Sequence, residues 1–471
     1  MRTAPSRWGV PGQPETMAGP RPVLSVFAAM MITVGIVVGA GIFQTPALVA
    51  NIAGSPLLMF AVWVLGGALS FIGALTYAEL ASVYPSAGGE YTFLTRAYGR
   101  NLSFLFAWAR TMVIVTGSIA LIGFILGDYL SHMWSLGPYS SPTYAALAVA
   151  FLTAINLAGL RGSSRIQNVL TVLEVAGVLL IGVAGLVFGS TPEDSPAVRG
   201  SDRGTLGLAL VFVLLTYGGW NDAAYFSAEL RAGPRAVLRT LLLSIGIITL
   251  LYLVFVFGLM SALGFEGLKK SDAIAVDAMN RILGSTAGQA VGVLVALSAL
   301  TSMNSTMLVG ARSNYALAGD WPVFGFMGRW HGARSAPQAG FIVQALITLG
   351  LIGFGALAKD GFSALVEFTA PVFWFFFMLT GVALLVLRWK EPGTIRPFKV
   401  PLYPWLPLVF IATCAYLLYS SIRHAQSEHA AYVALFVMMS GALAEIGLRL
   451  HEQYAKGADK ARSTASSVNH D

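Results

Sequence analysis

Long segments that lack charged residues determine what this chain can fold into. A helix that crosses the hydrocarbon core of a bilayer needs about 20 apolar residues, and twelve segments meet or approach that length. They cover residues 25–51, 56–83, 102–130, 143–160, 164–189, 204–231, 236–263, 287–317, 337–357, 362–388, 404–422 and 430–450. Only 11% of the residues are charged, against about 25% in a soluble domain. We therefore predict an all-α polytopic membrane protein with twelve transmembrane helices.

The first segment is interrupted near its middle. Its stretch VGIVVGAGIFQTP, residues 34–46, contains Gly35, Gly39 and Gly41 and then Pro46. A membrane helix tolerates such residues where other groups satisfy the freed backbone N–H and C=O. We expect a break that offers backbone groups to a bound solute. The alternative is an unbroken helix whose small residues permit close packing.

A second interruption lies in the sixth segment, in the stretch LLTYGGWND, residues 214–222. Gly218 and Gly219 interrupt an apolar run, and the polar residues Asn221 and Asp222 follow directly. Corresponding breaks in two halves of a transporter indicate an inverted repeat with the binding site between the halves. We therefore expect a 5+5 inverted repeat in which helices 1 and 6 are broken.

The domain organisation follows from these segments and from charge placement. We expect a tail over 1–24, repeats over 25–190 and 204–388, helices 11 and 12 within 404–450, and a tail over 451–471. Most lysines and arginines fall in the tails and in the loops on the same side, which predicts a multi-pass protein of the cell membrane with both termini in the cytoplasm. The basic residues are scattered over short loops and give no indication of nucleic-acid binding.

Four polar residues within the segments are candidates for a role in transport. An intramembrane charge usually faces the bundle interior or a water-filled cavity, and Arg110 and Glu174 are such charges. For Arg110, structural packing and a transport role are equally open, whereas for Glu174 we favour a function. Thr301 and Ser302 supply hydroxyl oxygens suited to Na⁺, although hydroxyls in helices commonly bond to the preceding turn.

Motifs for catalysis and for metal binding are missing from the sequence. It contains no Walker A, CxxC, GxSxG or HExxH pattern, so we expect no enzyme, cofactor or metal site. Cys414 is the single cysteine and excludes an intramolecular disulfide. We interpret residues 90–100 as an anchoring loop, with a helix lying at the membrane interface as the alternative. We interpret residues 264–288, after segment seven, as a solvated loop, and the alternative is a cap over an outer vestibule formed by the short helical pattern around Ile274, Ala278 and Ile282.

Six motifs in order resemble the amino acid–polyamine–organocation (APC) superfamily of amino-acid permeases. They are VGAGIFQTP, YAEL with PSAGGEY and RAYG, LRGSSRIQNVLTVLE, TYGGWNDAAYFSAELR with GPRAVLRT, TSMNSTMLVGARSNYALA, and RPFKVPLYPWLP. The glycine motifs are most similar to the L-type amino-acid transporter branch and its bacterial relatives. The resemblance implies the LeuT-type fold and a secondary active amino-acid transporter, a symporter or an exchanger that works by alternating access.

The resemblance also implies a binding site for a zwitterion. In the family, the break in helix 1 offers N–H groups to the substrate carboxylate, and the matching residues here are Gly39, Ala40 and Gly41. The break in helix 6 offers carbonyls to the substrate ammonium, and the matching residues are Leu215, Thr216 and Gly218. The remaining pocket positions are Val37, Tyr217, Gly219 and Asn221.

The chain departs from the family pattern at positions that concern specificity and coupling. Ala40 replaces a frequent serine, and Leu215 replaces an aromatic residue that often gates the site. Glu174 stands where relatives often have lysine, which is thought to replace a sodium ion between helices 1, 5 and 8. Because this reverses the local charge, we expect Glu174, with Thr301 and Ser302, to carry H⁺ or to help hold Na⁺.

Partners and alternative functions follow from the same comparison. Light chains of heteromeric transporters use an external cysteine between helices 3 and 4, and residues 131–142 contain none, so we expect no disulfide-linked heavy chain. The expected partners are an amino acid and the lipid bilayer. An amine or polyamine permease is an alternative, with Asp222, Glu174 and Glu367 as counter-charges, and a non-transporting amino-acid sensor is another.

Overall fold

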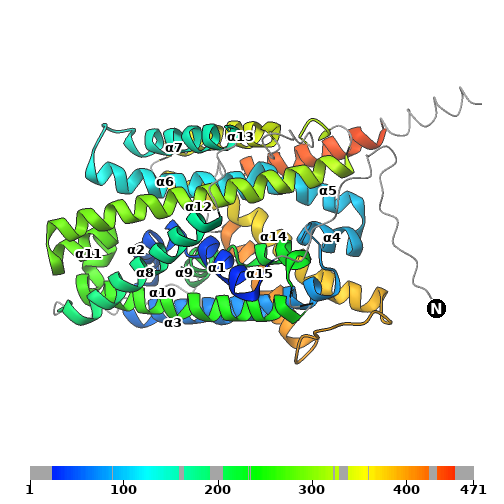
Figure 1. The fold of residues 1–471 in the computed structure, drawn as a ribbon, viewed down its shortest axis with the longest axis horizontal. Coiled ribbons are helices and arrows are strands. Elements are labelled where there is room, and N and C mark those ends of the chain that lie inside the picture. The colour runs from blue at the N-terminus through cyan, green and yellow to red at the C-terminus, as the bar shows by residue number, and fades with distance from the viewer. Residues whose placement is uncertain are drawn as a thin grey trace, which may run out of the picture.

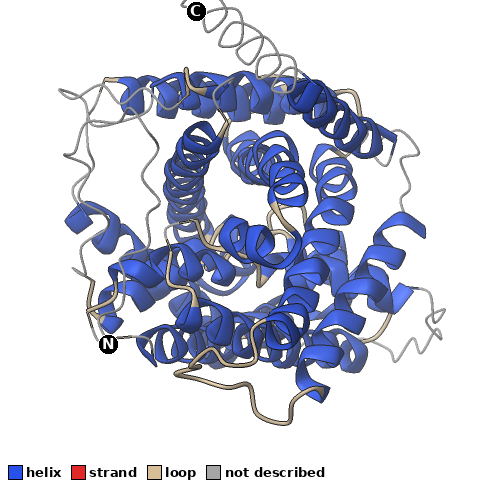
Figure 2. Ribbon diagram, turned by 90° about the vertical axis from the view of Figure 1, so that its right-hand side faces the viewer, coloured by secondary structure: helices blue, strands red, loops and turns tan. Residues whose placement is uncertain are grey.

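The computed structural model describes residues 24–86, 88–158, 164–190, 205–231, 233, 235–321, 324–327, 338–358, 360–423 and 432–450. Helices account for most of these residues, as Figure 2 shows. Together with the apolar surfaces of the long helices, this makes the chain a polytopic all-α membrane protein.

Within the described residues, eleven helical stretches are long and apolar enough to cross a membrane. Eight of them are α3 (Pro56–Val83), α5 to α6 (Arg100–Met133), α7 (Ser140–Leu157), α10 (Arg235–Lys270), α13 (Gln338–Ala356), α14 (Gly361–Lys390), α15 (Trp405–Arg423) and the helical stretch Tyr432–Leu450. In α8 (Ser164–Phe188) the apolar span begins at Val169, and in α12 (Ser285–Asp320) it ends at Ala311. The remaining span, Leu206–Tyr225, runs from α9 (Thr205–Thr216) into η3 (Trp220–Glu229). The first predicted segment is in pieces, α1 (Val26–Val37), η1 (Ala40–Phe43) and α2 (Thr45–Ala53). No piece spans a bilayer alone, so the count of twelve stays a prediction.

Two further helices replace the expected loops, so the interpretation of those stretches as loops is wrong. Helix α4 (Glu90–Tyr98) follows α3 and buries Phe93 and Leu94. Helix α11 (Ile274–Leu283) buries Ile274 and Ala278 on one face. In each case apolar residues recur at helical spacing, and burial of that face against the bundle stabilises a helix that is short on its own.

The long helices surround the two broken ones. Figure 1 shows α7 beside α13 at one edge and α6 beside α12 next to them, while α10 and α3 run along the opposite edge. The pieces α1 and α9 (Thr205–Thr216) lie between these groups (Figure 1). Helix α1 packs on α10, α8 and α12, and α2 packs on α9. The fold thus places both interrupted segments at the centre of the bundle.

Backbone hydrogen bonds also join the two interrupted segments at one end. The amide of Leu24, just before α1, donates to the carbonyl of Glu229 at 2.8 Å. The amide of Arg231 donates to the carbonyl of Leu24 at 2.9 Å. The start of the first broken helix and the end of the sixth therefore lie on the same side of the protein.

Candidate functional site

The first break separates α1 from α2 through a short 3-10 helix. Helix α1 ends at Val37, Gly39 is extended with φ −96° and ψ −171°, and η1 begins at Ala40. The first amides of a helix have no partner within it, and Gly39 has no side chain to cap them. These amides, with the dipole of the helix that continues toward α2, favour an anion at this point.

The second break is a turn of three residues between α9 and the 3-10 helix η3 (Trp220–Glu229). The amide of Gly218 donates to the carbonyl of Leu215 at 2.9 Å. Gly219 has φ +102°, and a Cβ there would lie 2.9 Å from Cγ2 of Ile36 in α1. Because Gly219 has no side chain, the backbone can turn there and the two broken helices can approach closely.

Side chains from two other helical segments connect the breaks, and sequence analysis missed both of them. The Tyr252 hydroxyl, on α10, donates toward the carbonyls of Val37 at 2.7 Å and of Thr216 at 3.1 Å. Thr45, at the start of α2, contacts Thr216 with an Oγ1–Oγ1 distance of 2.7 Å. A tyrosine within the apolar run LLYLVF, residues 250–255, is the only sequence signal of this arrangement.

A cavity of about 170 Å³ opens between the two breaks. The predicted site residues that line it are Val37, Gly39, Ala40, Gly41, Leu215, Thr216, Gly218, Gly219 and Asn221. Apolar side chains of the transmembrane helices form much of the rest of its lining, among them Ile114, Val115, Leu121, Ile122, Ile125, Phe212, Phe362, Val366 and Phe373. The structure therefore brings together backbone groups from both breaks and an apolar wall.

Tyr217 is the predicted pocket residue that the structure does not place in the cavity lining. Its side chain is buried behind the break, where its hydroxyl donates to the carbonyl of Trp63 at 3.3 Å. Its ring packs edge-on against Tyr252, with 5.1 Å between the ring centres. The interpretation of Tyr217 as a cavity residue is therefore wrong, because the turn directs its side chain into the core.

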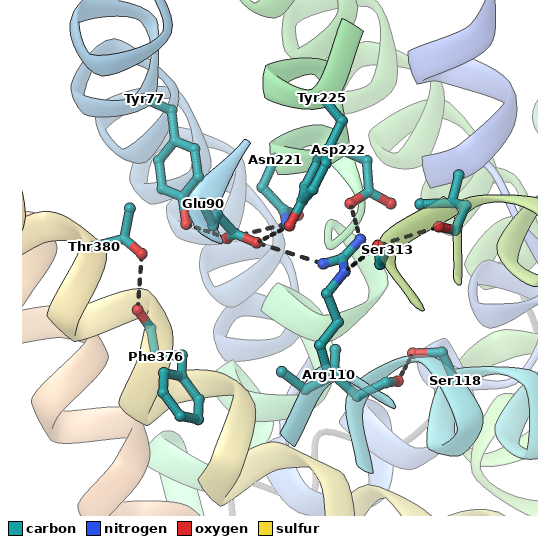
Figure 3. Close-up of polar contacts among 12 residues, drawn as sticks. Tyr77, Glu90, Arg110, Ser118, Asn221, Asp222, Tyr225, Ser313, Phe376 and Thr380 are labelled. Carbon is teal, nitrogen blue, oxygen red and sulfur yellow. Dashed lines mark hydrogen bonds and ion pairs between the residues drawn. The ribbon is translucent and has the colours of Figure 1, made fainter. Parts of the chain in front are cut away.

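A buried ionic cluster lies at one edge of the cavity (Figure 3). Arg110 belongs to a π-helical turn, η2 (Arg110–Ile114), between α5 (Arg100–Ala109) and α6 (Val115–Met133). Its guanidinium donates to Asp222 at 3.0 Å, to Glu90 at 3.4 Å and to Ser313 at 3.0 Å. The extra residue of a π turn changes the direction of the side chains that follow it, and such turns are frequent at functional sites.

The ion-coupling candidates lie beside the cavity, on α8 and α12. Glu174 is 2% exposed and accepts a hydrogen bond from Ser298, while its Oε2 has no partner among the described residues. Ser302 lies one turn after Ser298, and its Oγ would be 3.1 Å from a Cβ built on Gly39. The Thr301 hydroxyl instead donates to the carbonyl of Leu297 at 2.8 Å.

This arrangement supports two of the three coupling candidates. Glu174 and Ser302 face the region between α8, α12 and the first break, and the Oγ of Ser302 also has no hydrogen-bond partner in the described part of the chain. Thr301 makes the common bond to its preceding turn, which leaves it without a distinct role. Sequence analysis missed Ser298, which is one hydroxyl in a helix rich in hydroxyls.

A second, much smaller cavity lies behind the sixth-segment break. Its volume is about 20 Å³, and its lining includes Gly218, Trp220, Phe410 and Cys414. Cys414, on α15, is 1% exposed. The back of the break thus packs against α15 as well as against α3 and α14.

Comparison with known proteins agrees with this architecture. The family model described as "Amino acid permease" matches residues 24–441. The human cystine/glutamate transporter is 28% identical over 408 residues, which cover 85% of this chain and 80% of the relative. The mouse b(0,+)-type amino acid transporter 1 is 28% identical over 426 residues, covering 88% and 85%. The mouse large neutral amino acids transporter small subunit 2 is 28% identical over 413 residues, covering 85% and 76%.

The match spans the helices that build both breaks and the cavity between them. A match of this extent also explains why the sequence carries no catalytic motif, because its relatives are transporters. The chain therefore belongs to the amino acid permease family of the APC superfamily, and it is a secondary amino-acid transporter rather than an enzyme.

Proposed function

We propose that the cavity binds a zwitterionic amino acid and that alternating access carries it across the membrane. The amides of Ala40 and Gly41 bind the substrate carboxylate next to Gly39, whose own amide donates to the carbonyl of Val37 at 2.7 Å. The carbonyls of Leu215, Thr216 and Gly218 bind its ammonium. The main support is that Tyr252 bonds to a carbonyl of each break at once. The Tyr252 hydroxyl thereby keeps the amides of the first break and the carbonyls of the second break next to the same cavity.

The cavity wall favours a neutral amino acid with an apolar side chain. Aliphatic and phenyl groups from α6, α9 and α14 face the space beyond the two breaks. Burial of apolar surface stabilises a bound ligand by about 25 cal/mol per Å², whereas an unpaired charge on such a wall is costly. Leucine is therefore a suitable probe substrate.

Uptake by purified protein in proteoliposomes tests this proposal. We expect accumulation of radiolabelled leucine under a proton gradient, under a sodium gradient or by exchange with preloaded amino acid. Gly41→Val fills the cavity next to Thr216 and is expected to abolish leucine binding while the protein still inserts. Absence of amino-acid uptake in all three formats, or undiminished uptake by Gly41→Val, would contradict the proposal.

Glu174 is the residue that we propose for coupling to H⁺, with Ser298 as its hydrogen-bond donor. A buried carboxylate in a membrane is costly unless it is paired, protonated or bound to a cation. If Glu174 carries the proton, Glu174→Gln removes the pH dependence of uptake. Ser302 with Glu174 could instead hold Na⁺, and sodium-dependent uptake without pH dependence would decide for that ion.

The site favours amino acids over amines or polyamines. Of the three carboxylates that would serve as counter-charges, Asp222 lines the cavity but bonds to Arg110, while Glu174 and Glu367 lie outside the lining. Inhibition of substrate uptake by putrescine and not by leucine would instead indicate an amine or polyamine permease. A thermal shift on adding leucine without any flux would instead indicate a sensor.

The membrane setting completes the proposal. The charge distribution supports the cell membrane with both termini in the cytoplasm, and the two breaks support the 5+5 inverted repeat over 25–190 and 204–388. Cys414 is the single cysteine and is buried within α15, which supports transport without a disulfide-linked heavy chain. Accessibility of cysteines introduced near Leu24 to impermeant reagents in intact cells tests the orientation.

A further inference from the structure

The cavity has one cationic side chain among its described lining residues, Arg110. Arg110 is 4% exposed, and its guanidinium lies over the ring of Tyr225 at 4.5 Å from the ring centre. A buried arginine at the edge of a substrate cavity is a potential partner for a carboxylate, which it can bind through two parallel hydrogen bonds. What such a cavity accepts therefore depends on what already occupies this arginine.

Two carboxylates accept hydrogen bonds from Arg110, and the surrounding residues hold the two to different extents. Glu90 is 2% exposed and accepts hydrogen bonds from Tyr77 at 2.5 Å, from Asn221 at 3.3 Å and from Tyr225 at 3.2 Å (Figure 3). These contacts hold Glu90 behind the cavity, and it is absent from the lining. Glu90 is therefore a structural partner that keeps the arginine in place.

The Asp222 side chain has fewer hydrogen-bond partners than that of Glu90, and it reaches the cavity. Asp222 lines the cavity, and its side chain is 17% exposed. Among the described residues, the contact to Arg110 at 3.0 Å is the one hydrogen bond of the Asp222 side chain. It stands on η3, three residues after the glycine turn of the second break. Asp222 thus occupies the side of Arg110 that a substrate could approach.

We propose that Asp222 sets the charge selectivity of the cavity by occupying Arg110, so that amino acids with an anionic side chain are rejected. A substrate carboxylate that approached Arg110 would have to displace Asp222 or lie next to it. Two carboxylates at one site repel each other, and a displaced Asp222 would leave its charge unpaired in a poorly solvated cavity. This inference rests on the proposed function, because it concerns the substrate of the same site.

The test compares glutamate with leucine in proteoliposomes. The measured quantity is the ratio of radiolabelled glutamate uptake to leucine uptake, so a general loss of transport cancels. Asp222→Asn exposes the guanidinium to substrate without changing the size of the side chain. We expect the ratio to rise about tenfold, which corresponds to ~1.4 kcal/mol of altered discrimination. Asp222→Ser serves the same purpose if Asp222→Asn does not reach the membrane.

Three matched variants identify the cause of any change. Asp222→Glu keeps the charge and is expected to keep the wild-type ratio. Asp222→Asn combined with Arg110→Gln is expected to lose the gain, because the guanidinium is absent. Asp277→Asn neutralises a carboxylate on α11 outside the cavity lining and is expected to leave the ratio unchanged.

The outcomes separate this inference from the proposed function. Leucine uptake by the wild type together with an unchanged ratio in Asp222→Asn would overturn the selectivity role and leave the proposed function standing. A gain that persists in the Arg110→Gln double variant would also overturn the role, since a looser cavity would then explain it. A wild-type protein that transports no amino acid would overturn both.

Discussion

The two helix breaks look alike in the sequence but use their glycines differently. In the first break, a Cβ on Gly41 would meet Cγ2 of Thr216 at 3.7 Å, an ordinary contact. In the second, a Cβ on Gly218 would lie 2.8 Å from the carbonyl oxygen of Leu215, and Gly219 has a positive φ. Gly41 keeps space free in the cavity, whereas Gly218 and Gly219 permit the backbone conformation of the second break.

Among substitutions that distinguish the two breaks, one at Gly219 is expected to have the largest effect, and this effect is on stability. Gly219→Ala places a methyl group 2.9 Å from Ile36 Cγ2 at φ +102°, and backbone strain of this kind costs about 1–3 kcal/mol. We expect a clear fall in the melting temperature of the purified protein. A melting temperature equal to that of the wild type would show that the second break relaxes freely, and the contrast with the first break would then fail.

The next effect concerns the hydroxyl that joins the breaks. Tyr252→Phe removes the donor shared by Val37 and Thr216, and a buried group left without its partner costs about 1.5 kcal/mol. We expect lower stability and weaker leucine binding, measured by thermal shift and by competition. Tyr217→Phe is the matched control, because its hydroxyl bonds outside the cavity to Trp63, and it is expected to affect stability without changing affinity. Equal effects of both variants on affinity would contradict a bridging role.

A smaller effect is expected at Gly41, and here on binding rather than on folding. Gly41→Ala adds a methyl group that has room beside Thr216 but occupies space at the carboxylate end of the site. We expect the melting temperature to stay within error and the leucine affinity to fall about tenfold, or ~1.4 kcal/mol. Unaltered affinity would mean that the first break does not contact the substrate.

The smallest effect is expected at the hydroxyl pair between the breaks. Thr45→Val keeps the shape of the side chain but removes its contact with Thr216, worth about 0.5–1 kcal/mol. Thr143→Val removes an exposed hydroxyl on α7 that bonds to the carbonyl of Tyr139 in the preceding turn, and it provides the comparison in a thermal-shift series. If the two variants shift the melting temperature equally, the Thr45 contact contributes nothing specific to the joined breaks.

The breaks themselves were predictable because their signals are local. Glycine and proline act on the backbone where they stand, so the interruptions near Gly39 and Gly218 follow from a few adjacent residues. The partners were not predictable, since Tyr252 and Thr45 act through pairings between distant segments. Tyr217 was misplaced for a related reason: one residue of a turn decides whether a side chain enters the cavity or the core.

The ionic cluster illustrates the same limit for charged residues. The depth of Arg110 in its segment was evident from the sequence, but its partners were not. Glu90 comes from α4, a stretch interpreted as a loop, and Asp222 comes from η3, 112 residues after Arg110 in the sequence. Helical spacing of apolar residues in α4 and α11 was present, although burial against the bundle rather than intrinsic propensity decides whether such short stretches form helices.

The single cysteine has a practical consequence for measuring how this protein moves. Cys414 lies on α15 against the back of the second break and is almost completely buried. Because the sequence holds no other thiol, the unaltered protein already carries one chemical reporter at a defined place. The rate at which a small maleimide reacts would record how often α15 and the second break separate. Changes in that rate with substrate would time the motion without any engineered label.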